Sequence, residues 1–255
     1  MRQQRGICTG VVGIAILIAV LTVAANHATP QAAGGGLRVC LISGSAEYNS
    51  DASLARLQEH LEKHYAVKCS RAFAKSDSDL PGLENLDSCD GAVLFTRRLK
   101  LKGQQLDQIK KYCLSGKPLV GIRTASHAIQ TWLDLDREVF GGDYQNHYNE
   151  GPLCEIKVAE AAQDHPILKG FQPYKSVGSL YKNPNVAKDV TVLLTGTLPG
   201  HTEPIAWTRL HKGGRVFYTS LGHPKDFAEE SYLRLLTQAI FWTAKREVPR
   251  LRVSD

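Results

Sequence analysis

Runs of apolar residues punctuate the first half of the chain. A continuous apolar run between turn-forming residues is typical of a buried strand, and alternation of apolar and polar positions is typical of a half-buried one. On this pattern, four strands are predicted, at residues 37–43, 67–73, 91–95 and 119–122.

Amphipathic stretches separate these runs. A helix is predicted after residue 50, where Ser50 or Asp51 can cap it. Its apolar face consists of Leu54, Leu57 and Leu61. A second helix is predicted over residues 103–114, ending before Ser115 and Gly116. Because strands and helices alternate in this order, we expect an α/β fold with a mostly parallel sheet and right-handed crossovers.

The pattern changes after Gly141 and Gly142. The next long helical stretch comes at residues 228–243. Between them lie short strand-like runs, separated by Pro, Gly and Asn, at residues 154–158, 190–196, 205–208 and 216–220. The second half is therefore expected to form a β-rich extension on one edge of the sheet.

The amino terminus has the order of an export signal. The basic residues Arg2 and Arg5 precede an apolar run at 11–25, and a linker-like stretch follows at 26–36. We expect residues 1–25 to be a signal peptide cut after Ala25, with an uncleaved membrane anchor as the alternative. The domain at 37–249 is then periplasmic, extracellular or membrane-anchored, and meets a membrane only through this segment.

Composition adds little to this picture. The 255-residue chain is 43% hydrophobic and 22% charged, which is ordinary for a globular protein. Its net charge of +6 falls to +4 without Arg2 and Arg5, and no long Lys/Arg block is present, so a nucleic-acid partner is not expected. Of six cysteines, Cys8 would leave with the signal, and the spacing of the other five predicts no particular disulfide.

Polar side chains follow three of the predicted parallel strands. Because the carboxyl ends of parallel strands share one edge of a sheet, these residues are expected to converge in one site. They are Glu47, Tyr48, Arg97, Arg98, Arg123, Thr124, Ser126 and His127.

The fourth strand ends in a segment typical of a sharp strand-to-helix turn, with His127 expected to begin the helix. Residues 121–125 read Gly-Ile-Arg-Thr-Ala and resemble the Gly-Ile-Cys-x-Gly elbow of glutamine amidotransferases, with Arg123 at the position of the thiol. Arginine stays protonated and cannot act as a nucleophile, so glutaminase activity is not expected.

Further motifs complete a pattern that spans residues 37–243. They are Gly-Gly-Asp-Tyr at 141–144 followed by His147, His-Pro-Ile-Leu-Lys-Gly at 165–170, and Gly-Arg-Val-Phe-Tyr-Thr-Ser-Leu-Gly-His at 214–223. Together with the elbow, they resemble the ThuA-like (trehalose-utilisation) family of the class I glutamine amidotransferase-like superfamily. The resemblance implies a flavodoxin-like, doubly wound sheet with a pocket above it and an association with sugar catabolism, and it implies no particular reaction.

The chain departs from its relatives at two places. His223 resembles the catalytic histidine of the amidotransferases, but Lys225 replaces the orienting carboxylate, with Asp226 close enough to be a partial substitute. At Gly178-Ser179, many relatives carry an acidic pair before the tyrosine that corresponds to Tyr181.

The candidate site residues fall into two groups. Acid/base roles are expected of Glu47, His127, His147 and His223. Ligand binding is expected of Arg97, Arg123, Thr124, Ser126, Tyr144 and Trp207, where Tyr144 and Trp207 could equally be core residues. Arg123 is expected to pair with a carboxylate such as Glu47 or with a bound anion.

The resulting hypothesis is an exported protein that binds or acts on a carbohydrate or an oxidised sugar, without a cofactor. Hydrolysis, elimination and isomerisation all stay open. The alternatives are a non-catalytic carbohydrate-binding module and a metal-dependent hydrolase, and a homo-oligomer also stays open.

Overall fold

The computed structural model describes Met1, Gly6 and residues 36–148 and 152–249. The predicted signal or anchor and most of the predicted linker therefore lie outside the described residues. Among the described helices, none combines the length and the hydrophobicity that crossing a bilayer requires.

The first half forms the parallel part of one sheet. Its strands are β1 (Leu37–Gly44), β2 (Val67–Phe73), β3 (Gly91–Thr96) and β4 (Leu119–Ile122), and β9 (Gly214–Thr219) joins them from the end of the chain. Their order, β2-β1-β3-β4-β9, is that of a flavodoxin-like sheet. The predicted parallel sheet is confirmed.

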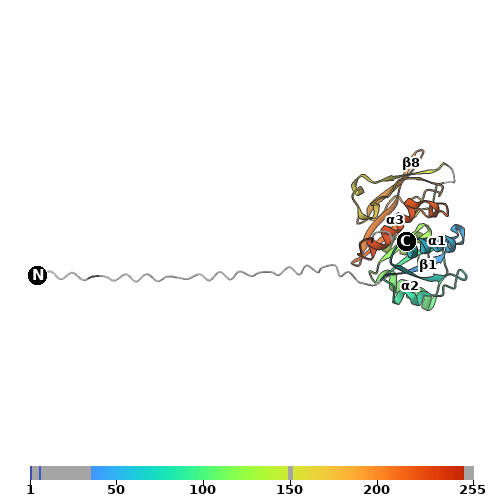
Figure 1. Ribbon diagram of the computed structural model, residues 1–255, viewed down its shortest axis with the longest axis horizontal. Helices are drawn as coiled ribbons and strands as arrows, with labels where there is room; N and C mark the ends of the chain where they lie inside the picture. Colours follow the sequence, from blue (N-terminus) through green and yellow to red (C-terminus); the bar gives the residue numbers. More distant parts are fainter. Residues whose placement is uncertain (2–5, 7–35, 149–151, 250–255) are drawn as a thin grey trace. The chain divides into compact units, whose positions relative to one another are not determined.

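Helices cover both faces of this sheet (Figure 1). On one face, α1 (Ser50–His64) and α3 (Glu230–Thr243) pack their apolar stripes onto alternate strand residues such as Leu41 and Phe95. On the other face, α2 (Gly103–Leu114) packs onto the intervening residues, such as Ile42. Every residue of the central strands β3 and β4 is buried, which explains their nearly continuous apolar sequences.

The second half extends the sheet with antiparallel strands. These are β5 (Cys154–Val158), β6 (Lys175–Ser176), β7 (Thr191–Leu198) and β8 (His201–His211), and they continue the order as β9-β8-β7-β5-β6. The predicted β-rich extension is confirmed, although β8 is longer than its apolar centre suggests and β6 is not apparent from the pattern.

Two helix starts differ from expectation. Residue Asn49, with φ of 45°, occupies the cap position of α1, and no side-chain cap bond forms there. The Ser50 hydroxyl instead accepts hydrogen bonds from the backbone N–H groups of Gly44 and Ser45, so it braces the loop after β1. The last helix starts at Glu230 because residues Asp226–Ala228 form a separate short turn.

The arrangement that positions the site is the shared carboxyl edge of β1, β3 and β4. Gly44 at the end of β1 pairs with Thr96 at the end of β3, and Leu94 of β3 pairs with Gly121 of β4. The loops that leave these strands therefore start side by side.

Candidate functional site

The elbow after β4 has the geometry that the sequence predicts. A 3-10 turn, η3 (Arg123–His127), follows the strand directly. Arg123 has a φ of 45°, a left-handed conformation that is uncommon for a residue with a side chain. The sharp turn of a nucleophile elbow is therefore present, with a cation at its apex. His127 ends this short turn and does not begin a longer helix.

The guanidinium of Arg123 points into the protein and is 1% exposed. Its Nη1 donates to the carbonyl oxygen of Ser220 at 2.7 Å, and its Nη2 donates to the hydroxyls of Tyr48 and Ser179, each at 3.1 Å. The ring centroids of Tyr48 and Tyr181 lie 4.3 and 4.7 Å from the guanidinium carbon. Two aromatic faces and neutral oxygens thus hold the buried charge.

The expected partner of Arg123 lies elsewhere. Glu47 pairs with Arg97 at 2.6 Å between Oε2 and Nε, and both side chains are about half exposed. Tyr48, the next residue, turns inward and takes the place beside Arg123. Within the described ranges, no carboxylate comes within ion-pair distance of Arg123. The expected pairing of Arg123 with Glu47 is therefore wrong.

Ser126 and His127 form a buried polar pair. The Ser126 Oγ and the His127 Nδ1 are 3.0 Å apart, and the imidazole stacks on the ring of Tyr144 at a centroid distance of 4.4 Å. Burial, reinforced by the charges of Arg98 and Arg97, lowers the pKa of His127 to about 3. The imidazole is therefore neutral at physiological pH, so it can accept or donate a hydrogen bond but has no imidazolium proton to give.

A cavity of about 600 Å³ opens beside this pair. Most of the described residues that line it have polar side chains, and Leu133 is the aliphatic exception among them. The lining residues are Arg98, Ser126, His127, Leu133, Asp134, Asp136, Arg137, Gly142, Asp143, Tyr144, Gln145 and Asn146. The structure thus brings Ser126, His127 and Tyr144 of the predicted site together around one cavity.

Asp136 is a lining residue that the sequence pattern does not single out. It begins a π-helical turn, η4 (Asp136–Phe140), and it is 6% exposed. Its Oδ2 accepts a hydrogen bond from the backbone N–H of Tyr144 at 3.0 Å, whereas its Oδ1 has no partner among the described residues. Burial raises the pKa of Asp136 to about 7. The signal in the sequence is weak, because burial of Asp136 depends on the Gly141-Gly142 loop folding over it.

The other two histidines of the predicted site are not part of this pair, although the ring of His147 stacks on Tyr181, which also contacts His127. His147 is exposed, and its Nδ1 lies 2.8 Å from the carbonyl oxygen of Tyr148. His223 is half-buried, and its Nδ1 accepts from the backbone N–H of Lys225 at 3.2 Å. Neither residue lines the cavity.

The Asp226 carboxylate does not orient the His223 ring by accepting a hydrogen bond from the ring Nδ1, because that atom is itself an acceptor. The carboxylate instead accepts the backbone N–H groups of Gly222 and His223, both at 2.9 Å, and the hydroxyl of Ser176 at 2.7 Å. It shapes the loop after β9. The interpretation of Asp226 as a substitute for the lost triad carboxylate therefore has no support in this geometry.

Thr124 and Trp207 are packing residues in this structure. The Thr124 hydroxyl donates to the Ser45 hydroxyl at 3.2 Å and joins the first loop to the elbow. Trp207 is buried on β8, and its indole N–H donates to the carbonyl oxygen of Phe140 at 2.7 Å. Neither side chain lines the cavity, so Trp207 offers no stacking surface there.

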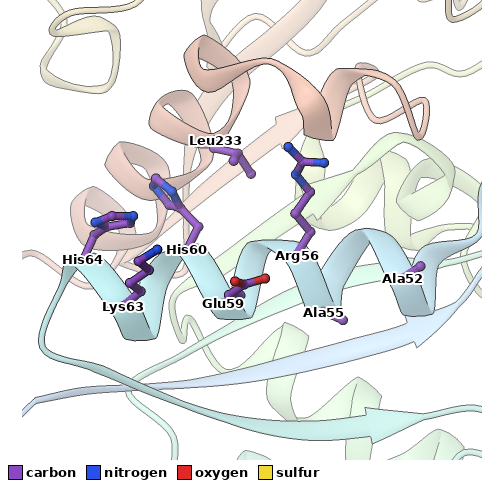
Figure 2. Close-up of a pocket in the computed structure, with 8 residues that line it drawn as sticks. All are labelled: Ala52, Ala55, Arg56, Glu59, His60, Lys63, His64 and Leu233. Atoms are coloured by element: carbon purple, nitrogen blue, oxygen red, sulfur yellow. The ribbon is translucent and has the colours of Figure 1, made fainter.

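A second cavity, of about 560 Å³, runs along the outside of α1 (Figure 2). Arg56 and His60 point from α1 towards α3, whose Leu233 completes the lining. Its other lining residues are Ala52, Ala55, Glu59, Lys63 and His64. His60 and His64 stand four residues apart with ring centroids 5.2 Å from each other. No loop from the carboxyl edge contributes to this cavity.

In the part of the chain that the structure describes, no three or more His, Cys, Asp or Glu side chains come together in a group that could hold a metal ion. The imidazole pair on α1 offers two such ligands. The residues described here thus offer no ready-made metal centre of the usual kind.

Several solved structures share this fold. A ThuA-like protein from Parabacteroides merdae is 17% identical, with a TM-score of 0.65 over 85% of this chain and 92% of that one. A ThuA-like protein from Bacteroides uniformis is also 17% identical, with a TM-score of 0.63 over 83% and 93%. A GMP synthase component from Thermoplasma acidophilum is 14% identical, with a TM-score of 0.51 over 82% and 95%. At these identities, the likeness shows the fold alone.

A comparison with curated proteins gave no match. A family model described as trehalose utilisation matches residues 38–243, most of the chain. The chain therefore belongs to the ThuA (trehalose utilisation) family.

Proposed function

We propose that this protein binds or acts on a carbohydrate or an oxidised sugar in the cavity beside Ser126 and His127, and that it has no glutaminase activity. The observation that carries the proposal is the lining of that cavity. It combines hydroxyl, neutral imidazole, carboxyl, amide and guanidinium groups within about 600 Å³, a volume in the range of small-molecule sites. A sugar needs such a mixture because each of its hydroxyls both donates and accepts.

The elbow after β4 supports the proposed lack of glutaminase activity. Arg123 stands at the thiol position, points inward and is enclosed by Tyr48 and Tyr181. The Nδ1 of His223 accepts a backbone N–H, so this atom does not donate to a carboxylate as the corresponding atom of a catalytic triad does. The apex of the elbow therefore supplies no thiol for attack on glutamine.

We also propose that the domain works outside the cytoplasm, either released or tethered by residues 11–25. The support is the order of basic residues, apolar run and small residues at the amino terminus. Labelling of a cysteine introduced into the domain by a membrane-impermeant reagent on intact cells would test this location.

Calorimetric titration of the protein with trehalose, glucose and their oxidised derivatives tests the proposed ligand class. We expect saturable binding of at least one of them, and about a tenfold weaker affinity for Ser126→Ala, which removes one cavity hydroxyl. The matched control is Ser179→Ala, which removes a hydroxyl that bonds to Arg123 outside the cavity. Failure of every sugar to bind, or equal binding by wild type and Ser126→Ala, would contradict the proposal.

Glutaminase activity is tested by incubating the protein with glutamine and measuring ammonia. We expect no release above the buffer background. A covalent glutamyl adduct, detected by mass spectrometry of the intact protein, would overturn this part of the proposal.

A further inference from the structure

Asp136 is a lining residue of the cavity, and its carboxyl lacks a full set of partners. The residue is 6% exposed, and its Oδ1 has no hydrogen-bond partner within the described ranges. Leaving a buried carboxyl oxygen unpaired is unfavourable, so either a proton or a bound ligand is needed there. The π-helical turn that carries Asp136 is a rare conformation that is frequent at functional sites.

The loop at residues 141–144, directly after η4, packs closely against the Asp136 carboxyl. The N–H of Gly142 donates to the backbone carbonyl of Asp136 at 3.1 Å, and the N–H of Tyr144 donates to its Oδ2. A Cβ on Gly142 would overlap the Asp136 carboxyl, so only glycine allows this approach. The same loop carries Tyr144 onto His127. Asp136 is therefore built into the cavity wall beside the Ser126–His127 pair.

Burial, more than neighbouring charge, favours the neutral form of Asp136. Burial raises its pKa to about 7, and the charge of Asp143 adds to this effect, while the Tyr144 N–H and Arg137 oppose it. The buried Tyr218 of β9 is close enough to interact electrostatically with Asp136. Arg209 of β8 donates to two backbone carbonyls of η4, and η3 contributes the neutral His127.

Asp143 has the opposite behaviour, although it lines the same cavity. Its burial would favour the neutral form, but hydrogen bonds from Asn185 and Gln145 and the charge of Arg137 lower its pKa overall. Both Asp143 oxygens are occupied by these donors. In functional sites, two neighbouring carboxyls often have pKa values that their environments shift in opposite directions. One carboxyl then keeps its proton while the other is ionised.

We propose that Asp136 is the specificity-determining residue of the cavity, and that as a neutral carboxylic acid it donates a hydrogen bond to the carbonyl or carboxylate oxygen of an oxidised sugar. This inference rests on the proposed function and narrows its ligand class. A carbonyl or carboxylate oxygen can only accept hydrogen bonds, so it is complementary to a protonated Asp136, which donates one. If the ligand oxygen belongs to a carboxylate, the hydrogen bond is also charge-assisted. Arg98 and Arg137 in the same lining add attraction for a negative ligand.

The test compares D-glucose with D-glucosone, its 2-keto derivative, and with D-glucuronate. Titrations at pH 8 in two buffers of different ionisation enthalpy measure the protons taken up on binding. Because the pKa of Asp136 is about 7, most of the free protein has lost this proton at pH 8. We expect wild type to prefer an oxidised sugar over glucose, to take up close to one proton, and to lose about tenfold in affinity per pH unit above 7.

Two variants isolate the carboxyl. Asp136→Asn keeps a hydrogen-bond donor but cannot take up a proton, so its uptake is expected to vanish and its affinity to become independent of pH. Glu138→Gln, an exposed carboxyl of the same turn that does not line the cavity, is the matched control and should behave as wild type. Infrared difference spectra of wild type against Asp136→Asn should show a protonated carboxyl at pH 6 that disappears by pH 8.

The outcomes separate the two proposals. Sugar binding without proton uptake, a preference for glucose, or no protonated carboxyl at pH 6 overturns the role of Asp136 while the proposed function stands. If none of the sugars tested binds, the proposed function fails, and the role of Asp136 as a donor to sugars fails with it, even where the infrared band shows its proton.

Discussion

At the scale of single residues, Arg123 shows how a buried cation is held without a carboxylate. Its planar group lies against Tyr48 and Tyr181 and donates to the carbonyl oxygen of Ser220. A lysine at this position would keep the charge but would lose the flat faces and the forked set of donors. The interactions are therefore specific to arginine and not to positive charge in general.

This leads to a prediction on stability. Arg123→Lys is expected to reduce the free energy of unfolding by about 2–4 kcal/mol, because it leaves buried oxygens and a buried charge poorly paired. Urea denaturation at pH 7 measures the loss. Arg56→Lys, the same change at an exposed position of α1, should stay within about 0.5 kcal/mol of wild type. Equal losses for both variants would show that the enclosure of Arg123 contributes nothing.

Asp136 carries a prediction on pH dependence. Its pKa is about 7 in the folded protein and near 3.8 in an unfolded chain, so the unfolded state loses this proton first as the pH rises. The contribution of Asp136 to the free energy of unfolding is therefore greatest below pH 4, falls between about pH 4 and 7, and is constant above. The expected total fall is on the order of 4 kcal/mol. Asp136→Asn should lack this fall, as measured by denaturation at a series of pH values, and Glu138→Gln should retain it.

The sequence identified part of the site at this scale. The strand-end rule placed Ser126 and His127 at the carboxyl edge, and both line the cavity. It could not show that Glu47 would pair with Arg97, because that depends on the conformation of the loop after β1. Asp136 was missed for a similar reason, since only the approach of Gly142 buries it.

At the scale of elements, the regular helices and strands of the first half were predictable and the turns between them were not. The strand β4 and the helix α2 have the predicted bounds, because their apolar patterns are local. The cap of α1 differs because the Ser50 hydroxyl bonds to Gly44 and Ser45, residues of the preceding loop. The π-helical turn η4 has no counterpart in the sequence pattern, since hydrogen bonds from Tyr144 and from Arg209 of β8 hold it.

The close approach of Gly142 to the Asp136 carboxyl predicts that a methyl group added at position 142 destabilises the protein. Gly142→Ala is expected to reduce the free energy of unfolding by about 1–3 kcal/mol, because its Cβ would overlap the Asp136 carboxyl. Gly91→Ala is the matched control, since its Cβ would meet Pro118 at an ordinary contact distance of 3.4 Å. Thermal denaturation compares the two. A Gly142→Ala protein as stable as Gly91→Ala would show that the loop yields without cost.

At the scale of the whole molecule, the sheet joins two kinds of β-structure at β9. This strand pairs parallel with β4 on one side and antiparallel with β8 on the other. The change of composition after Gly142 predicted this division. The strand order within the antiparallel half was not predictable, because the two-residue β6 leaves no apolar pattern and the pattern of a strand does not identify its neighbour.

The burial of the cysteines gives a prediction for the folded domain as a whole. Burial raises the pKa of the Cys40, Cys69 and Cys113 thiols to about 12 and that of Cys154 to about 11, and it also raises the pKa of Cys89. In a Cys8→Ser protein, we expect little reaction with an aromatic disulfide reagent at pH 8 and five reactive thiols after unfolding. Rapid reaction of the native protein would contradict this burial.

The contacts of Arg123 also bear on how the chain folds. Its guanidinium joins segments that are 75 and 97 residues away in sequence, at Tyr48 and Ser220. Such bonds can form only after the sheet has brought distant loops together, so they belong to the late part of folding. Removing them should therefore accelerate unfolding far more than it slows folding. Arg123 would then prolong the lifetime of the native state by slowing its unfolding.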